Sequence, residues 1–130
     1  MPILHSINEE LGIVISSWVG EISDADLLPS YKKLYENKIW KPGFNEIVDV
    51  RNAQVKNVTS KGLLQLSELV KSYVKEKGIE FKTAIIAPED LQFGLSRVYE
   101  AISHKSPEKI MVFRDLNNAF DWLCIDIKID

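Results

Sequence analysis

Apolar and polar residues alternate near the start of the chain, which is the pattern of strands with two different faces. Two β-rich runs cover residues 3–7 and 12–19, and the turn-forming residues 8–12 separate them. A turn between two such runs is typical of consecutive strands that pair with each other. The pattern therefore predicts an antiparallel hairpin at this end of the chain.

The next segment has the spacing of an amphipathic helix. Apolar residues recur three and four positions apart between Leu27 and Tyr35, which places them on one side of a helix. Ser23 and Asp26 come before or at the start of this segment, and these residue types favour a helix N-terminus. Pro29 interrupts the pattern, so we expect the helix either to begin a few residues late or to bend there.

From residue 44 onward, β-rich segments alternate with segments of helical spacing. Strands are predicted at 44–50, 81–87 and 109–113, and helices from about 58 to Gly78, from 88 to about 103, and after Asp115. Strands that alternate with helices imply right-handed crossovers and a mainly parallel sheet. We therefore expect a single α/β domain over residues 1–130, with a mixed sheet of about five strands, about four helices and the hairpin at one edge.

Composition narrows the class of protein. The 130 residues carry a net charge of −3, with acidic and basic side chains interspersed, so the chain has no basic stripe for nucleic acid. Its one cysteine, Cys124, lies in an apolar run and is expected to behave as a small hydrophobe. Because no disulfide is possible and neither a signal peptide nor a membrane-spanning run is predicted, we expect a cytoplasmic protein.

The sequence contains no recognisable catalytic or metal-binding motif. His5 and His104 are the only histidines, and neither belongs to a motif with metal-ligand spacing. The glycine patterns of nucleotide-binding loops and the nucleophile elbow of hydrolases are also absent. We therefore expect no catalytic residues, no metal and no cofactor.

Four residues in the middle of the chain are candidate functional residues. Asp49 and Arg51 end the predicted strand at 44–50, where parallel sheets gather ligands, although an ordinary surface ion pair is the alternative. A short loop should follow, and Ser60 is the expected N-cap of the next helix, with Thr59 as the alternative cap. Ser60 is also a candidate regulatory hydroxyl, because a phosphate there would lie at the positive end of the helix.

The helix predicted to begin near residue 88 contains an unexpected glycine. Within a helix Gly94 costs about 1 kcal/mol relative to alanine, which suggests either a close backbone approach or an exposed helix start beside a ligand. Phe93 and Arg97 lie on one side of this helix. These two residues and Tyr99 are therefore assigned to a partner or ligand surface.

Three blocks of sequence resemble a known family. They are Val48-Asp49-Val50-Arg51, the stretch from Ala84 to Asp90 followed by Phe93-Gly94-x-x-Arg97-x-Tyr99-Glu100, and Phe113-Arg114-Asp115-Leu116-x-x-Ala119-x-x-Trp122-Leu123. On these residues the chain resembles the SpoIIAA-like family. That family is related in fold to STAS domains (the anti-sigma-factor-antagonist fold) and more distantly to the lipid-binding domain of Sec14-type proteins. Its members are largely uncharacterised, so the resemblance implies an α/β fold and little about mechanism.

The phosphorylated anti-sigma antagonists carry Asp-Ser-Ser-Gly at the corresponding helix start. Here the residues at that place are Thr59-Ser60-Lys61-Gly62, so Lys61 occupies the position of the phosphoacceptor. A lysine cannot play that part, and the phosphoswitch of that family is not transferred to this chain.

The first functional hypothesis is a non-enzymatic regulatory or interaction domain of the STAS-like type. The surface from Asp49 to Ser60, together with Phe93 and Arg97, would bind a partner protein or a second copy of the chain as a homodimer. An enzyme whose site is built from Asp49, Arg51 and Arg97 is the weakest alternative, because no nucleophile and base occur at a recognised spacing.

The second hypothesis is a module that binds a small hydrophobic ligand or a lipid. It rests on the Sec14-type resemblance and on four aromatic residues, Trp18, Trp40, Phe93 and Tyr99. These side chains are expected to line a concave apolar pocket with a few polar groups.

Overall fold

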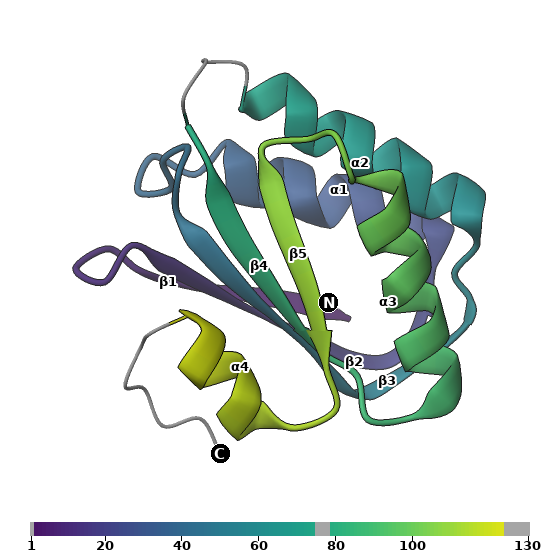
Figure 1. Ribbon diagram of the computed structural model, residues 1–130. Coiled ribbons are helices and arrows are strands. Elements are labelled where there is room, and N and C mark those ends of the chain that lie inside the picture. The colour runs from purple at the N-terminus through teal and green to yellow at the C-terminus, as the bar shows by residue number, and fades with distance from the viewer. Residues whose placement is uncertain (1, 75–78, 124–130) are drawn as a thin grey trace.

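The computed structural model of the chain describes residues 2–74 and 79–123. In this part of the chain, five strands form one sheet in which the spatial order of the strands follows their order in the sequence (Figure 1). β1 pairs with β2 antiparallel, and every later pair is parallel. The strands are β1 (Ile3–Asn8), β2 (Ile13–Ser23), β3 (Asn45–Asn57), β4 (Phe81–Ile86) and β5 (Glu108–Phe113).

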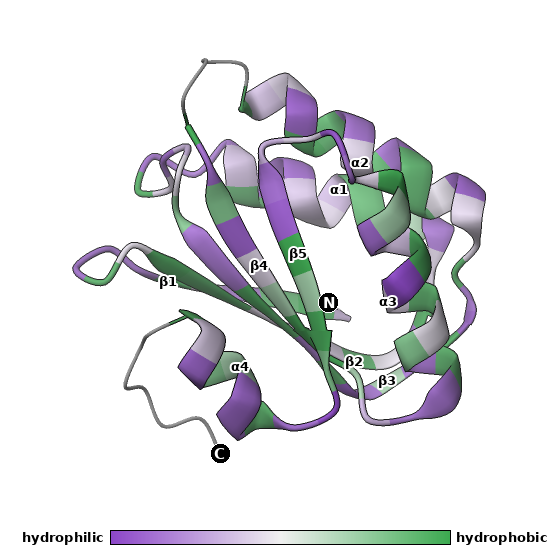
Figure 2. Cartoon of the chain, viewed as in Figure 1, coloured by the Kyte–Doolittle hydropathy of each residue, from purple (hydrophilic) through white to green (hydrophobic). Residues whose placement is uncertain are grey.

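Four helices within the described residues cover the two faces of the sheet: α1 (Asp24–Tyr35), α2 (Ser60–Tyr73), α3 (Asp90–Ile102) and α4 (Leu116–Leu123). The first three pack on one face and enclose the larger apolar core, and α4 packs on the other (Figure 1). Hydrophobic and hydrophilic positions alternate along these helices (Figure 2), as expected when one side lies on a sheet. The predicted α/β class, with an antiparallel hairpin at one edge of a mainly parallel sheet, is confirmed.

None of the described helices is long and apolar enough to cross a membrane. The predicted helix end at Gly78 and the predicted apolar setting of Cys124 both fall outside the described residues.

The largest difference from the sequence-based expectation concerns β3. It continues to Asn57, through a region where a loop is predicted after Arg51. β2 runs beside it to Ser23, and the register between the two strands shifts twice. At the first shift Val50 and Arg51 lie opposite Trp18 alone, which is a β-bulge. A bulge interrupts the two-residue alternation of side chains along a strand, so the polar and apolar pattern after Arg51 no longer indicates a strand.

The helix that contains Pro29 begins earlier than one of the two expectations allowed. α1 starts at Asp24 and continues through the exposed Pro29. Its N-terminus is closed by Asp26, whose carboxylate accepts a hydrogen bond from the backbone N–H of Ser23 at 2.8 Å. This hydrogen bond satisfies a free donor at the helix start. Because the helix begins at Asp24, the expectation that it begins a few residues late is wrong.

Thr59, and not Ser60, caps α2. The Oγ1 of Thr59 accepts a hydrogen bond from the backbone N–H of Gly62 at 3.3 Å, and Ser60 is already the first helical residue. The carboxylate of Asp24 completes the cap, because it accepts hydrogen bonds from the N–H of Thr59 at 2.8 Å and from its hydroxyl at 2.5 Å. The preferred assignment of Ser60 as the cap is therefore wrong, and the alternative is correct.

Two helical glycines have opposite surroundings. A Cβ added to Gly62 would overlap the carboxylate of Asp24, whereas a Cβ added to Gly94 would meet nothing within 4 Å. Gly62 is therefore required where α1 approaches the start of α2. The close backbone approach suggested for Gly94 is wrong, because this residue lies on the exposed side of α3.

We expect the same substitution at these two glycines to change stability in opposite directions. Gly94→Ala should raise the free energy of unfolding by about 1 kcal/mol, since alanine costs less backbone entropy in a helix. Gly62→Ala should lower it, because Asp24 must leave the cap of α2, a loss of about 1 kcal/mol or more beyond the helical gain. Urea denaturation of both variants measures the difference, and equal changes would contradict the packing described for Gly62.

Candidate functional site

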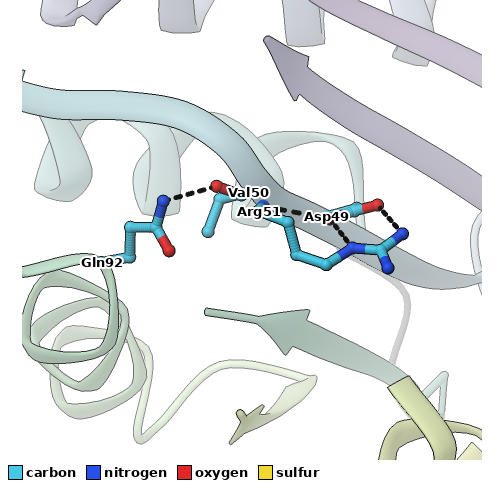
Figure 3. A network of polar contacts seen from close by, with 4 residues as sticks. All are labelled: Asp49, Val50, Arg51 and Gln92. Carbon is cyan, nitrogen blue, oxygen red and sulfur yellow. Dashed lines mark hydrogen bonds and ion pairs between the residues drawn. The ribbon is translucent and has the colours of Figure 1, made fainter. Parts of the chain in front are cut away.

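Asp49 and Arg51 form a local ion pair at the bulge of β3 (Figure 3). The Nε and Nη2 atoms of Arg51 donate hydrogen bonds to the two carboxylate oxygens of Asp49 at 3.0 and 2.8 Å. The backbone N–H of Arg51 donates to the same carboxylate at 3.1 Å, and the hydrogen bonds to Asp49 raise the pKa of Arg51. Because the carboxylate is used in these contacts, the pair stabilises the bulge, as in the structural alternative considered for these residues.

Gln92 joins α3 to this same corner of the sheet (Figure 3). Its Nε2 donates hydrogen bonds to the carbonyl oxygens of Val50 at 2.7 Å and Ala53 at 2.9 Å. β4 pairs with β3 only as far as Asp49, so the amide of Gln92 replaces the missing strand as a donor. The predicted juxtaposition of the strand end and α3 is therefore present, through a residue that the sequence analysis did not single out.

Phe93 and Arg97 lie on α3 but take part in separate contacts. The guanidinium of Arg114 stacks over the ring of Phe93 at 4.3 Å from its centroid and donates to the carbonyl of Pro88 at 2.8 Å. Arg97 pairs with Glu100 at 3.4 Å and is exposed. Within the described residues, neither side chain bonds to Asp49 or Arg51, so these four predicted residues form no single cluster.

Thr59 and Ser60 lie at the junction of α1 and α2. The backbone and hydroxyl of Thr59 are held by Asp24, as described above, and Ser60 is exposed. A regulatory role for the Ser60 hydroxyl stays a prediction.

The four aromatic residues expected to line a pocket divide into two groups. Trp18 and Tyr99 are buried, with exposed fractions of 7% and 6%, and both line an internal cavity. Trp40 packs beside the rings of Tyr35 and Tyr73, and Phe93 lies under Arg114. Tyr99 therefore belongs to the interior of the protein and does not form part of its outer surface.

This cavity lies between the sheet and helices α1–α3, and we call it the core cavity. It leaves about 50 Å³ in which the centre of a water molecule can move, roughly enough for three to five waters. Most of its lining is aliphatic or aromatic, and within the described residues the lining contains no lysine, arginine or histidine. Two carboxylic acids, Glu46 and Glu108, also face it.

Glu46 is buried on β3, and none of the described residues that line this cavity with it is basic. The hydroxyls of Ser16 and Tyr31 donate hydrogen bonds to its Oε2 at 2.5 and 3.1 Å. Burial raises the pKa of Glu46 to about 8, and the nearby charge of Glu108 adds to the shift. Glu46 is therefore mainly uncharged at neutral pH.

Glu108, at the start of β5, is the second buried acid. Its Oε2 accepts a hydrogen bond from the hydroxyl of Thr83 at 2.5 Å, and its Oε1 accepts one from the hydroxyl of Tyr99 at 3.0 Å. Burial raises the pKa of this carboxyl as well. Both of its oxygens are thus paired with protein donors.

His5 forms the outer end of the network that begins at Glu46. Its Nδ1 lies 2.7 Å from the hydroxyl of Ser16, and its Nε2 lies 2.9 Å from that of Ser30. Burial lowers the pKa of His5 to about 4, so the ring is neutral. Ser16 gives its proton to Glu46 and therefore accepts one from Nδ1 of His5. This direction is the reverse of what activation of a serine nucleophile requires.

The positions of both acids in the sequence could have indicated that they are buried. Glu46 lies inside the predicted strand 44–50, and Glu108 directly precedes the predicted strand 109–113. A charged residue within a strand that is buried on both faces must find partners or lose its charge. The sequence does not show which side chains supply those partners, because Ser16 and Tyr31 come from distant segments.

Comparison with known proteins shows the fold. No family profile and no curated protein matches the chain. One solved structure, an uncharacterised protein of the DUF3478 family with a SpoIIAA-like fold from Shewanella loihica PV-4, is similar over 94% of this chain and 92% of its own. The TM-score is 0.57 and the identity is 21%. Together with the observed strand order, this likeness shows that the chain has the SpoIIAA-like fold.

Proposed function

We propose that this protein is a non-enzymatic module that binds a compact, largely apolar small molecule in the core cavity. The observation that carries the proposal is a buried carboxyl group, Glu46, that faces an apolar space and whose Oε1 has no hydrogen-bond partner among residues 2–74 and 79–123. Binding sites for small molecules typically combine apolar walls with a few placed polar groups. The volume favours a compact molecule over the lipid suggested by the Sec14-type resemblance.

The cavity offers little for catalysis. Its hydroxyl groups on Thr83 and Tyr99 donate to Glu108, and Ser16, which is fully buried, donates to Glu46. These protons are donated to carboxyl oxygens, so none of these three hydroxyls is prepared as a nucleophile. Within the described residues, no group of three His, Cys, Asp or Glu side chains is arranged to hold a metal ion.

Titration of the ¹⁵N-labelled protein with cyclopentanone tests the proposal. We expect concentration-dependent shifts of backbone amides at Val48, Val50 and Leu63, which line the cavity. Leu66→Phe should weaken the response by filling the cavity, whereas Leu64→Phe, on the exposed side of α2, should not. Shifts confined to surface amides, or equal effects of the two variants, would contradict binding in the core cavity.

Association with a second copy of the chain is the other candidate, and the outer side of α3 favours it. Leu91 and Val98, seven residues apart, are 55% and 37% exposed. Arg97 and Glu100 beside them carry opposite charges, so a two-fold axis would bring Arg97 of each copy to Glu100 of the other. Sedimentation equilibrium should then show a dimer that Arg97→Glu weakens, and a monomer at every concentration would contradict this candidate.

A further inference from the structure

The hydrogen-bonding groups around the core cavity are almost all used by the protein itself. Tyr31 donates to Glu46 and accepts a hydrogen bond from the indole N–H of Trp18 at 3.2 Å. The amide of Gln92 bonds to two backbone carbonyls, and its Oε1 accepts from the N–H of Glu89 at 3.3 Å. A ligand therefore meets few free polar atoms in this space.

Two groups are exceptions: the carboxyl of Glu46 and the hydroxyl of Tyr35, which also lines the cavity and takes part in no hydrogen bond within the described residues. Both hydrogen bonds of Glu46 end on Oε2, and within the described residues its Oε1 has no partner. The side chain is 94% buried, since the residue is only 6% exposed, and it lines the cavity. A buried carboxyl without a cation beside it is uncharged. Because Ser16 and Tyr31 donate to Oε2, the remaining proton belongs on Oε1, where it has no acceptor among the described residues.

We propose that the core cavity selects a compact, uncharged molecule that places one hydrogen-bond acceptor, such as a carbonyl oxygen, against the Oε1–H of Glu46. This inference rests on the proposed function and adds the chemical class of the ligand. The Oε1 of Glu46 is not sealed off by the protein, because no fully buried side-chain N or O atom of the described residues lacks a partner. It is therefore open to an acceptor that enters the cavity, and the two would form a hydrogen bond. The two acids and the lack of basic residues in the described lining disfavour an anion.

Near neutral pH, the neighbouring phenols and His5 do not change their charge. Binding in the cavity should therefore depend on pH mainly through the proton of Glu46. α1 presents Tyr31 and Tyr35, and α3 presents Tyr99, and burial raises the pKa of all three phenols, which keeps them neutral. From β1, His5 reaches Glu46 only through Ser16 and is neutral. α2 contributes aliphatic side chains to the lining, and β5 contributes the acid Glu108.

Three probes with the same ring distinguish an acceptor, an apolar molecule and a cation as the ligand: cyclopentanone, cyclopentane and cyclopentylamine. Each is titrated into the full chain, and binding is followed by the shifts of backbone amides. We expect cyclopentanone to bind about fivefold more tightly than cyclopentane, which corresponds to one hydrogen bond. Its affinity should fall about threefold between pH 7 and pH 9, toward that of cyclopentane, as Glu46 loses its proton.

Substitutions of Glu46 and of one exposed acid provide the controls. Glu46→Gln keeps an N–H donor toward the cavity but cannot ionise, so it should retain the preference for the ketone and lose the pH dependence. Glu46→Met should abolish the preference, and a preference that survives Glu46→Met but is lost in Tyr35→Phe would overturn the assignment to Glu46. Glu68→Gln, at an exposed acid of α2 outside the cavity lining, should leave both the preference and its pH dependence unchanged. If Glu46→Met does not fold, the pH profile of Glu46→Gln decides.

The outcomes separate this inference from the proposed function. If none of the three rings shifts the amides of the lining, the cavity binds no such molecule and the proposed function fails. If cyclopentane binds as tightly as cyclopentanone, only the requirement for an acceptor is overturned. Tighter binding of cyclopentylamine, with an affinity that rises with pH, would instead assign the two acids to a cationic ligand.

Discussion

The free energy of unfolding is expected to fall by about 2 kcal/mol as the pH rises from 6.5 to 8. The pKa of Glu46 is about 8 in the folded protein and has an ordinary value of 4.5. Between these values the folded state keeps a proton that the unfolded state has lost, so stability decreases as pH rises. One pH unit corresponds to about 1.4 kcal/mol for one such group, and Glu108, whose pKa is also raised, acts in the same direction.

The lower limit of this pH range, 6.5, is set by His5, because His5 changes stability in the opposite direction at lower pH. Its pKa is about 4 when folded and 6.5 ordinarily, so the unfolded state takes up a proton first as the pH falls below 6.5. The contribution of neutral His5 to stability is therefore lost between pH 6.5 and 4. Above 6.5 this contribution is complete, and the slope reports the two buried acids.

Urea denaturation in steps across pH 6.5–8.5 measures this slope. Glu46→Gln should remove the part that belongs to Glu46 and leave the part that belongs to Glu108. Glu68→Gln, at an exposed position of α2, is the matched control and should leave the slope unchanged. A free energy of unfolding that stays constant or rises across this window would show that Glu46 is charged in the folded protein.

Gln92→Leu is expected to lower the free energy of unfolding by about 2–4 kcal/mol. The substitution leaves the buried carbonyls of Val50 and Ala53 without the donor that replaces a neighbouring strand, and each unsatisfied group costs about 1–3 kcal/mol. Gln65→Leu makes the same chemical change at an exposed position of α2 and should stay within about 0.5 kcal/mol.

Hydrogen exchange gives a second readout of the role of Gln92. The amides of β3 beyond Asp49 should exchange faster in Gln92→Leu, while those of β1 should keep their protection relative to the global stability. Similar losses for Gln92→Leu and Gln65→Leu would mean that the two hydrogen bonds from Gln92 contribute nothing beyond helix propensity.

The fold could be predicted from the sequence because its elements follow the local pattern closely. The apolar run at 81–87 and the helical spacing from Leu27 to Tyr35 each correspond to one element of the structure. The prediction failed in β3 after Arg51, where two bulges shift the register and remove the period. It also placed the cap of α2 on Ser60 instead of Thr59, because adjacent hydroxyl residues are equally suitable caps by type.

The candidate site was predictable only in part. The contact between β3 near Val50 and the start of α3 at Gln92 follows from the parallel topology, since carboxyl ends of parallel strands share an edge. The core cavity does not follow from any local pattern. Its acids Glu46 and Glu108, and the aromatic residues Trp18 and Tyr99, come from four different elements, and only the packed structure brings them together.

Every strand in this sheet is the neighbour of the strand that precedes it in the chain. During synthesis from the N-terminus, each new parallel strand therefore meets an edge that is already complete, and none has to wait for a later segment before it can pair. In this order, only a short stretch of chain lies between two strands that pair. The loss of chain entropy at each pairing step is therefore small. We expect the nascent chain to assemble strand by strand, with β5 as the last addition.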